Sequence, residues 1–491
     1  MKDKVSQQKI DLDQFFSARE KVLSMWPTGK EVDLEEAISY QRRLPENKSF
    51  HKVVERLHEE GKTRVFPRAG TPVIEDEIEL NRALVEAGVP LIPVTTDSYT
   101  RLCQYEKAQH ALEETIRTGR PKLNGYPIVN HGVHKTRRMT ESCEAPLNPR
   151  FANLDCRLIA EIALASGMTG ILADPFLTFG NYEKTATIGD CIANYQYIYR
   201  LIGYYTDNGA MITIDLDSWL AHGPFPNSIS LITAIMAALI AAEQGVKSIV
   251  PWSNCEGNMM QDIAYARLTK RMVKEYLDHF GFKDVMVPGL FVAQIPIFPC
   301  PQETGYSFGY LTYTAMVAAL AEAEAVSVRT IDEAHGIATK EAHAMSYRAA
   351  HWIFNVVRKQ RIKLQSEQIE IEEKMAEMEV RAIFNRILEL GNGDIVVGFV
   401  RAVDAGVVDS PMSANINVKS QVLGIRDHEG AVRYLDFGNL PIPEEAKKFH
   451  REKVREREQV EQRKMDYNVF IEDFWALSKG EIVGVKKPVK F

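Results

Sequence analysis

The sequence has few cysteines and lacks the hydrophobic segments that mark export or membrane insertion. Its six cysteines are scattered, with no CxxC pair and no HExxH motif elsewhere, so neither a disulfide framework nor a zinc site is indicated. The amino-terminal residues have no apolar signal core, which argues against export. The longest apolar run, residues 229–242, is too short to cross a bilayer. We therefore expect a cytoplasmic protein with reduced thiols and no membrane span.

A strong positive charge is also absent, because the 491 residues carry a formal net charge of −7. This balance argues against a dominant nucleic-acid surface. Neither GxGxxG nor GxxxxGKS/T occurs in the chain, and a doubly wound nucleotide-binding sheet would be expected to carry one of these phosphate loops. The sequence therefore disfavours that fold.

Strand and helix signals alternate between about residues 64 and 330. Short apolar runs such as RVFPRAG, PLIPV, PIVNHGV (127–133) and AMITIDLDS are separated by helix-length segments, which lie at 76–87, 104–118, 155–166, 188–206, 229–244, 259–280 and 311–324. Regular alternation of this kind is typical of parallel sheets. With no nucleotide loop, it favours an α/β fold with a TIM-type (β/α)8 barrel. There is one strand candidate too many, and PLNPR (146–150) is the weakest.

The remaining segments predict additions at both ends of the barrel. We expect an N-terminal helical arm over 1–60, the barrel over 61–340, and a C-terminal extension of helices and small strands over 341–491. Within the extension, the pattern predicts one long helix at 342–390 and strands at 394–403 and 432–441.

Three arginines follow predicted strands. Arg68, Arg101 and Arg150 each end a segment that begins as a short apolar run. Because the carboxyl ends of barrel strands converge on one pocket, these side chains could share a ligand. Planar guanidinium forks suit a substrate that carries carboxylates, although a single arginine after a strand is more often a surface ion pair.

Nine stretches, in order along nearly the whole chain, are similar to one known family. They are WPTGKEVDL (26–34), PRAG (67–70), SYTR (98–101), LNGYP with VN (123–130), RLIAEI (157–162), AAEQGVK (241–247), GNMMQDIA (257–264), EAHGIATKEA (333–342) and VRYLDFGN (432–439). On these motifs the chain resembles the large (epsilon) subunit of glutamate mutase, also called methylaspartate mutase, an adenosylcobalamin-dependent isomerase.

The resemblance implies a barrel whose mouth is capped by cobalamin. In the family, most of the cofactor is held by a small sigma-type subunit with a DxHxxG loop, whose histidine binds cobalt. No DxHxxG occurs here, so the resemblance implies the substrate-binding subunit, as a homodimer within a heterotetramer. The family reaction is a radical 1,2-rearrangement of L-glutamate to 3-methylaspartate.

The resemblance also implies roles for individual residues. Family positions that contact substrate match Arg68, Arg101, Arg150 and Tyr182. Positions that line the cofactor match Gly70, Asn124, Phe298, Glu333 and Ile337, together with Arg329, where the family has lysine, and Asn181, where it has proline.

Three departures concern the substrate. Leu172 stands where the family has a glutamate that accepts a hydrogen bond from the substrate ammonium, Thr178 replaces a tyrosine, and Phe151 replaces a histidine. Asp174, two residues on, is a possible substitute for the missing carboxylate. Because a buried ammonium without an acceptor is costly, we expect poor activity on L-glutamate and better acceptance of a dicarboxylate whose amine is absent, masked or moved.

Two other functions remain open on the sequence. The chain could be a non-catalytic barrel that binds a carboxylate or a partner, which is consistent with Leu172. It could also be a metal-independent lyase with Lys340 as a Schiff base, although a lysine in a helix past the last strand is more often solvated.

The missing cobalt-ligand loop leads to a first prediction. We expect the purified chain alone to bind adenosylcobalamin weakly, and to bind it well only with a small DxHxxG partner. Gel filtration with absorbance detection of the bound corrin measures this directly. Tight, stoichiometric binding by the isolated chain would contradict the expectation.

Overall fold

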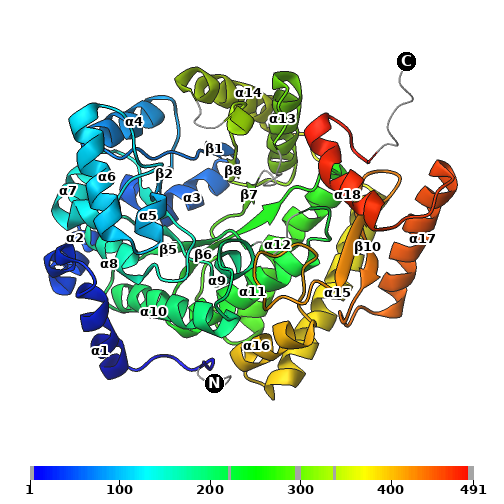
Figure 1. Cartoon of the computed structure of the whole chain (residues 1–491), viewed down its shortest axis with the longest axis horizontal. Helices are drawn as coiled ribbons and strands as arrows, with labels where there is room; N and C mark the ends of the chain where they lie inside the picture. Colours follow the sequence, from blue (N-terminus) through cyan, green and yellow to red (C-terminus); the bar gives the residue numbers. More distant parts are fainter. Residues whose placement is uncertain (1–4, 219–222, 294–299, 336–338, 485–491) are drawn as a thin grey trace.

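The computed structural model describes residues 5–218, 223–293, 300–335 and 339–484. It is an α/β structure in which helices surround a curled parallel sheet (Figure 1). Six strands pair in the order β1–β8–β7–β6–β5–β4, and a second sheet pairs β2 with β3. The strands are β1 (Arg64–Phe66), β2 (Ile92–Thr95), β3 (Leu147–Arg150), β4 (Gly170–Leu172), β5 (Thr213–Leu216), β6 (Ser248–Asn254), β7 (Phe291–Ala293) and β8 (Ala325–Ser327).

The two sheets approach each other where β1 and β2 end. The backbone N–H of Thr95 donates to the carbonyl of Ala69 at 2.7 Å, which brings the end of β2 to the segment after β1. Among the described residues, however, no ladder joins β1 to β2 or β3 to β4. The structure thus shows a parallel, curled sheet with helices around it.

Helices follow the strands as the sequence predicts. In the sheet region they are α4 (Ile74–Glu86), α5 (Ser98–Arg101), α6 (Tyr105–Thr118), α7 (Ile128–Ser142), α8 (Arg157–Ala165), α9 (Pro175–Leu177), α10 (Ile188–Asp207), α11 (Ser228–Glu243), α12 (Met259–His279) and α13 (Thr304–Leu320). No helix in the described ranges is both long and apolar enough to span a membrane.

The surplus strand candidate is PIVNHGV and not PLNPR. PLNPR forms β3, in parallel register with β2, whereas PIVNHGV begins α7. The N–H groups of Asn130 and His131 both donate to the carbonyl of Pro127, which starts helical bonding there. Gly132, at φ 71°, then makes a kink within the helix. The prediction that PLNPR was the weakest strand is therefore wrong.

The N-terminal arm packs against the sheet region, and one of its helices reaches the interior of the sheet. Its helices are α1 (Leu12–Leu23), α2 (Leu34–Arg42) and α3 (Phe50–Glu59), with short turns η1 (Pro27–Glu31) and η2 (Glu46–Lys48). Phe50 of α3 shares a buried cluster with Phe66, Trp252 and Phe291, which belong to β1, β6 and β7. The inside of the curled sheet is therefore filled by aromatic rings, and it provides a solid floor beneath the strand ends.

The C-terminal region differs from its sequence prediction in two places. The predicted long helix is two helices, α14 (Lys340–Lys359) and α15 (Glu367–Gly391), and the segment predicted as a strand at 394–403 is helix α16 (Ile395–Ala405). Asp394 caps α16 by accepting from the N–H groups of Val396 and Val397 at 2.9 and 3.0 Å. A Cβ on Gly398 would lie 2.1 Å from the carbonyl oxygen of Ile387, so this glycine permits close packing of α16 on α15.

A hairpin and two helices complete the chain, and buried ion pairs hold them. The elements are β9 (Val422–Arg426), β10 (Val432–Phe437), α17 (Glu444–Glu461), α18 (Tyr467–Ala476) and the turn η5 (Leu477–Lys479). Arg457 donates from both Nη atoms to the carboxylate of Asp473 at 2.6 and 2.9 Å, and both side chains are buried. Arg433 is likewise buried between Glu372 and Asp427.

The pairing of Arg457 with Asp473 gives a second prediction. The change Asp473→Ala should lower the free energy of unfolding by about 3–5 kcal/mol, because it leaves a buried guanidinium without its main partner. Urea unfolding followed by circular dichroism measures the loss. The matched control is Glu389→Gln, which removes an exposed pair with Arg386 and should cost less than about 1 kcal/mol. Equal effects of the two changes would contradict the prediction.

Candidate active site at the carboxyl ends of the strands

Arg150, the last residue of β3, lies on the aromatic floor of the sheet. Its guanidinium carbon is 4.9 Å from the ring centre of Trp252 and 5.4 Å from that of Phe66. Its Nη1 pairs with Asp215, and its Nη2 is 3.3 Å from Oδ2 of Asp217. Asn148 donates from Nδ2 to the other oxygen of Asp215 at 2.7 Å. Arg150 is therefore held between two rings and two acids.

Asp217 is the residue at which the charges of several strand ends meet. Burial raises the pKa of Asp217 above its usual value, and the guanidinium groups of Arg150, Arg68 and Arg329 each lower it. Arg150 ends β3, and Arg68 and Arg329 come just after β1 and β8. Of the three, Arg150 contacts Asp217 directly, while the charges of Arg68, a predicted substrate residue, and of Arg329, which the resemblance assigned to the cofactor, influence Asp217 electrostatically.

Arg329 and Glu333 form an ion pair after β8. Nη1 of Arg329 lies 2.5 Å from Oε1 of Glu333, and the Glu333 side chain keeps 34% of its surface exposed. Cys300 lies beside this pair: burial raises the pKa of its thiol, while the Arg329 charge lowers it and the Glu333 charge raises it. The pair presents a partly exposed acceptor, Glu333, on one side of the arginine cluster.

Arg101 ends α5, in the segment that follows β2. Its Nη2 donates to the hydroxyl of Ser98 at 3.2 Å, and Ser98 donates in turn from its N–H to Oδ1 of Asn124 at 2.9 Å. Asn153, three residues after Arg150, donates from its side-chain amide to the Arg101 carbonyl. Nε of Arg101 is buried and has no hydrogen-bond partner within the described chain. Among the described residues, no ion pair joins Arg101 to the acids around Arg150, so the structure places it nearby but outside that cluster.

Gly70, a predicted cofactor residue, has a packing role in this structure. A Cβ at Gly70 would lie 2.6 Å from the carbonyl oxygen of Thr95, and one at Gly125 would lie 2.4 Å from the same atom. Thr95 pairs with Arg150 in the β2–β3 register. Both glycines therefore permit the backbone to pass close to the strand end that carries Arg150.

Two residues that differ from the family, Leu172 and Phe151, lie in an apolar part of the site. Leu172 ends β4, is opposite Asp215 in the register with β5, and shares a buried apolar cluster with Ala152 and Leu177. Phe151 is also buried. Leu172 is thus a packed wall residue beside Asp215.

Asp174 does not have an open carboxylate in this structure. Its Oδ1 accepts from the N–H groups of Phe176 and Leu177 at 2.8 and 3.0 Å, which caps α9, and its Oδ2 accepts from the Ser218 hydroxyl at 2.5 Å. Burial raises the pKa of Asp174 to about 6. Both oxygens are engaged in local structure, which argues against Asp174 as a replacement for the family glutamate.

A π-helical turn, η3 (Thr178–Tyr182), carries three further predicted residues. Thr178 shares a hydrogen bond of 2.7 Å with the hydroxyl of Tyr195, and Asn181 donates to the Leu177 carbonyl at 3.2 Å. Tyr182 is 45% exposed. Of the other predicted residues, Phe298 and Ile337 lie outside the described residues, as does the side chain of Lys340 at the start of α14.

Asp215 and Asp217 were missed by sequence reasoning, yet a signal was present. Asp215 lies in the last part of β5, and Asp217 comes just after the strand. Both therefore occupy the strand-end position that identified the arginines. In TIDLDS they are two residues apart, and alternate residues of a strand face the same side. Applying the strand-end argument to acids would have identified them.

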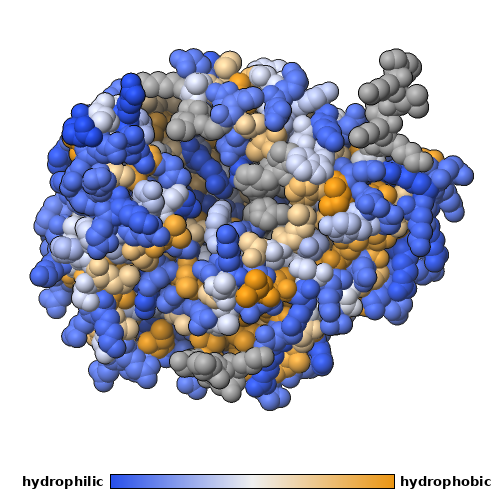
Figure 2. Space-filling model, viewed as in Figure 1, coloured by the Kyte–Doolittle hydropathy of each residue, from blue (hydrophilic) through white to orange (hydrophobic). Residues whose placement is uncertain are grey.

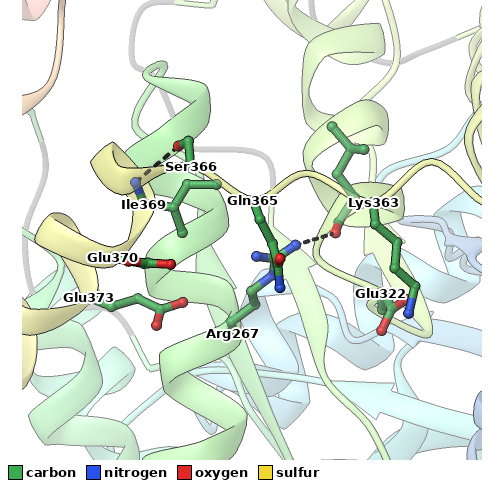
Figure 3. Close-up of a pocket in the computed structure, with 9 residues that line it drawn as sticks. Arg267, Glu322, Lys363, Gln365, Ser366, Ile369, Glu370 and Glu373 are labelled. Carbon is green, nitrogen blue, oxygen red and sulfur yellow. Dashed lines mark hydrogen bonds between the residues drawn. The ribbon is translucent and has the colours of Figure 1, made fainter.

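The molecule has a central hollow over the sheet and a second, separate pocket, and the second is less suited to this chemistry. The surface is hollowed near its middle, over the curled sheet, and hydrophilic residues lie in that hollow (Figure 2). A separate pocket of about 380 Å³ is lined by Arg267, Leu320, Glu322, Lys363, Gln365, Ser366, Ile369, Glu370 and Glu373 (Figure 3). Glu322 precedes β8, so this pocket lies toward the amino ends of the strands, where barrel proteins do not place active sites.

Comparisons with known proteins match the chain over nearly its whole length. The family model described as methylaspartate mutase E chain (MutE) matches residues 44–486. The glutamate mutase epsilon subunit of Desulfitobacterium hafniense is 38% identical over 97% of this chain and 98% of that protein. The one from Treponema denticola is 35% identical over 98% and 99%. Among solved structures, the carboxyl transferase domain of Rhizobium etli pyruvate carboxylase covers 87% of this chain and 77% of its own, at 10% identity and a TM-score of 0.31, which is too low to support an argument.

The buried state of Asp174 gives a third prediction. Its folded pKa, about 6, exceeds the ordinary value of 3.8, so the parent protein should lose stability as pH rises from about 4 to about 6. Asn at this position keeps an acceptor for the helix cap and does not ionise. The unfolding free energy of Asp174→Asn relative to the parent should therefore rise across that window, by up to about 3 kcal/mol. Urea unfolding at pH 4, 5, 6 and 7 measures it, and a difference that stays constant with pH would refute it.

Proposed function

Because the chain belongs to the methylaspartate mutase E chain family, we propose that it is the substrate-binding subunit of an adenosylcobalamin-dependent carbon-skeleton mutase. Its substrate is L-glutamate or a related dicarboxylate. The observation that carries this proposal is the placement of Arg68, Arg150 and Arg329 at or just after the ends of β1, β3 and β8, with Arg150 in contact with Asp217. Arginine forks in a partly buried cluster are suited to binding carboxylates bidentately.

The proposal includes a closed (β/α)8 barrel. The strand order of the six-stranded sheet, the pairing of β2 with β3, and the hydrogen bond from Thr95 to Ala69 all support a ring of eight strands. In such a ring the arginines at the ends of β1, β3 and β8 face one mouth.

The arginines are proposed to hold the two carboxylates of the substrate. Arg68 is exposed and can turn toward a ligand, whereas Arg150 is fixed by Asp215 and by the Trp252 and Phe66 rings. The buried Nε of Arg101, which has no hydrogen-bond partner among the described residues, is a donor whose desolvation would be offset by a ligand oxygen. A fixed and a mobile fork together would orient a dicarboxylate along the mouth.

Residues at the rim have chemistry that fits a cobalamin. Only one oxygen of Glu333 contacts Arg329, and the other is an acceptor suited to ribose hydroxyls. Asn124 is exposed beside α5 and can meet polar groups of the corrin ring. When bound, adenosylcobalamin supplies the radical that begins the rearrangement. The hydrocarbon walls at Leu172 and Phe151 would keep water from the reacting groups.

A small DxHxxG subunit is proposed as the partner that holds most of the cofactor. The absence of DxHxxG from this chain supports the division, because the cobalt ligand must then come from elsewhere. We further propose that two copies of this chain assemble with two small subunits into a heterotetramer.

A second function is favoured by the apolar packing of Leu172. Ala152, Leu172 and Leu177 form a buried hydrocarbon cluster at the site, which would suit a barrel that binds a dicarboxylate without turning it over. This non-catalytic alternative predicts binding of the acid and no radical.

Reconstitution distinguishes the two functions and gives a fourth prediction. The full chain, a small DxHxxG subunit and adenosylcobalamin are mixed with L-glutamate or other dicarboxylates, and an organic radical is sought by electron paramagnetic resonance. We expect a substrate-dependent radical and isomerised product. Arg150→Lys should lower kcat/KM at least about tenfold, because lysine keeps the charge and loses the fork. Dicarboxylate binding without any radical would favour the non-catalytic function, and no binding at all would refute both.

A further inference from the structure

Of the two acids that face Arg150, Asp217 is the one whose contacts leave an oxygen available to a ligand. Its Oδ2 contacts Arg150 at 3.3 Å, and within the described chain no hydrogen bond reaches its Oδ1. Asp215, by contrast, is fully buried and uses both oxygens, one on Arg150 and one on Asn148. Asp215 therefore fixes Arg150, while Asp217 makes the longer contact and retains acceptor capacity.

Asp217 lies near Leu172, the residue that stands where the family has a glutamate. Leu172 is opposite Asp215 in the parallel register of β4 and β5, so the two side chains share one face. Asp217 lies two residues beyond Asp215, which moves it about 6 to 7 Å toward the mouth on that same face. An acid on β5 thus stands beside the hydrocarbon that Leu172 supplies on β4.

Asp174 cannot take this role without breaking local structure. Its two oxygens accept from Phe176, Leu177 and Ser218, so turning it toward a ligand would uncap α9. Asp217 would give up nothing comparable, because its open oxygen is not used by the fold.

The charges around Asp217 also favour a ligand that carries an amine. Three guanidinium groups, of Arg68, Arg150 and Arg329, face three carboxylates, of Asp215, Asp217 and Glu333. Asp174, whose pKa the charge of Asp217 raises, adds a fourth carboxylate, so these acids outnumber the three arginines. A ligand that brings an ammonium group to Asp217 offsets that excess. A dicarboxylate without its amine, with a net charge of −2, would leave excess negative charge next to Asp217.

We propose that Asp217 accepts a hydrogen bond from the ammonium group of an amino dicarboxylate, and that it thereby sets the preference for amine-bearing substrates. This inference rests on the proposed function, because it needs a dicarboxylate bound by the arginines. Leu172 alone led to the opposite expectation, a preference for dicarboxylates without an amine, because that expectation did not include Asp217 as an acceptor. Its effect is on specificity, through binding of the amine.

The test compares two ligands that differ by the amine. L-Glutamate and glutarate are titrated into the full chain by calorimetry, for the parent and for Asp217→Asn, with Asp217→Ser as a second neutral variant. The matched control is Glu322→Gln, in the pocket toward the amino ends of the strands. Circular dichroism verifies that each variant is folded.

We expect the parent to bind L-glutamate more tightly than glutarate. Asp217→Asn should weaken L-glutamate at least about tenfold, as loss of a charge-assisted hydrogen bond does, while glutarate binds as well as before or better. The control should leave both affinities unchanged. The ratio of the two affinities is the decisive quantity, because a purely structural role of Asp217 would move both together.

Three outcomes overturn the inference. A parent that prefers glutarate would show that the amine has no acceptor, whether or not the variants fold. An unchanged affinity ratio in the folded variants would show that Asp217 only holds Arg150, and the proposed function would survive. A parent that binds neither acid would remove the dicarboxylate site, and with it both the proposed function and this inference.

Discussion

The structure of the mouth depends on keeping one nearly buried guanidinium charged. Arg150 has aromatic rings beneath it and little contact with water, so its charge requires acids at close range. Asp215 and Asp217 meet that requirement from β5, and Asn148 fixes Asp215 in turn. The same acids that stabilise the arginine also decide how much positive charge remains for a ligand. Stability and substrate choice are therefore linked through one set of contacts.

Strand-end reasoning located much of this site because it depends only on where buried runs stop. It identified Arg68 and Arg150, whose charges meet at Asp217. The acids Asp215 and Asp217 occupy the same kind of position at the end of β5 but lie outside a pattern defined by arginines. The sequence alone does not show that Asp174 caps a helix. Whether a carboxylate at this position is open to a ligand or engaged in the fold depends on contacts that appear only in three dimensions.

The fold was predicted where the spacing of elements was regular and was missed where a short apolar run was ambiguous. A run such as 394–403 suits a buried strand or a buried helix equally well. Asp394 before it and Gly406 after it are helix-end signals that could have decided the matter. The helix that PIVNHGV begins is harder to foresee, because Tyr126, just before it, still bridges Thr96 in parallel, and helical bonding begins only at Pro127.

The pairing of β1 with β8 sets an order on how the chain can assemble during synthesis. The ladder partner of Arg64–Phe66 is Ala325–Ser327, so β1 leaves the ribosome long before the strand that completes its hydrogen bonding. At about 5–20 residues per second, that interval is on the order of tens of seconds. Phe66 and the rings it later packs against must stay shielded during this time. Apolar surface that stays open for this long makes a nascent chain prone to aggregation, and chaperones counter that risk.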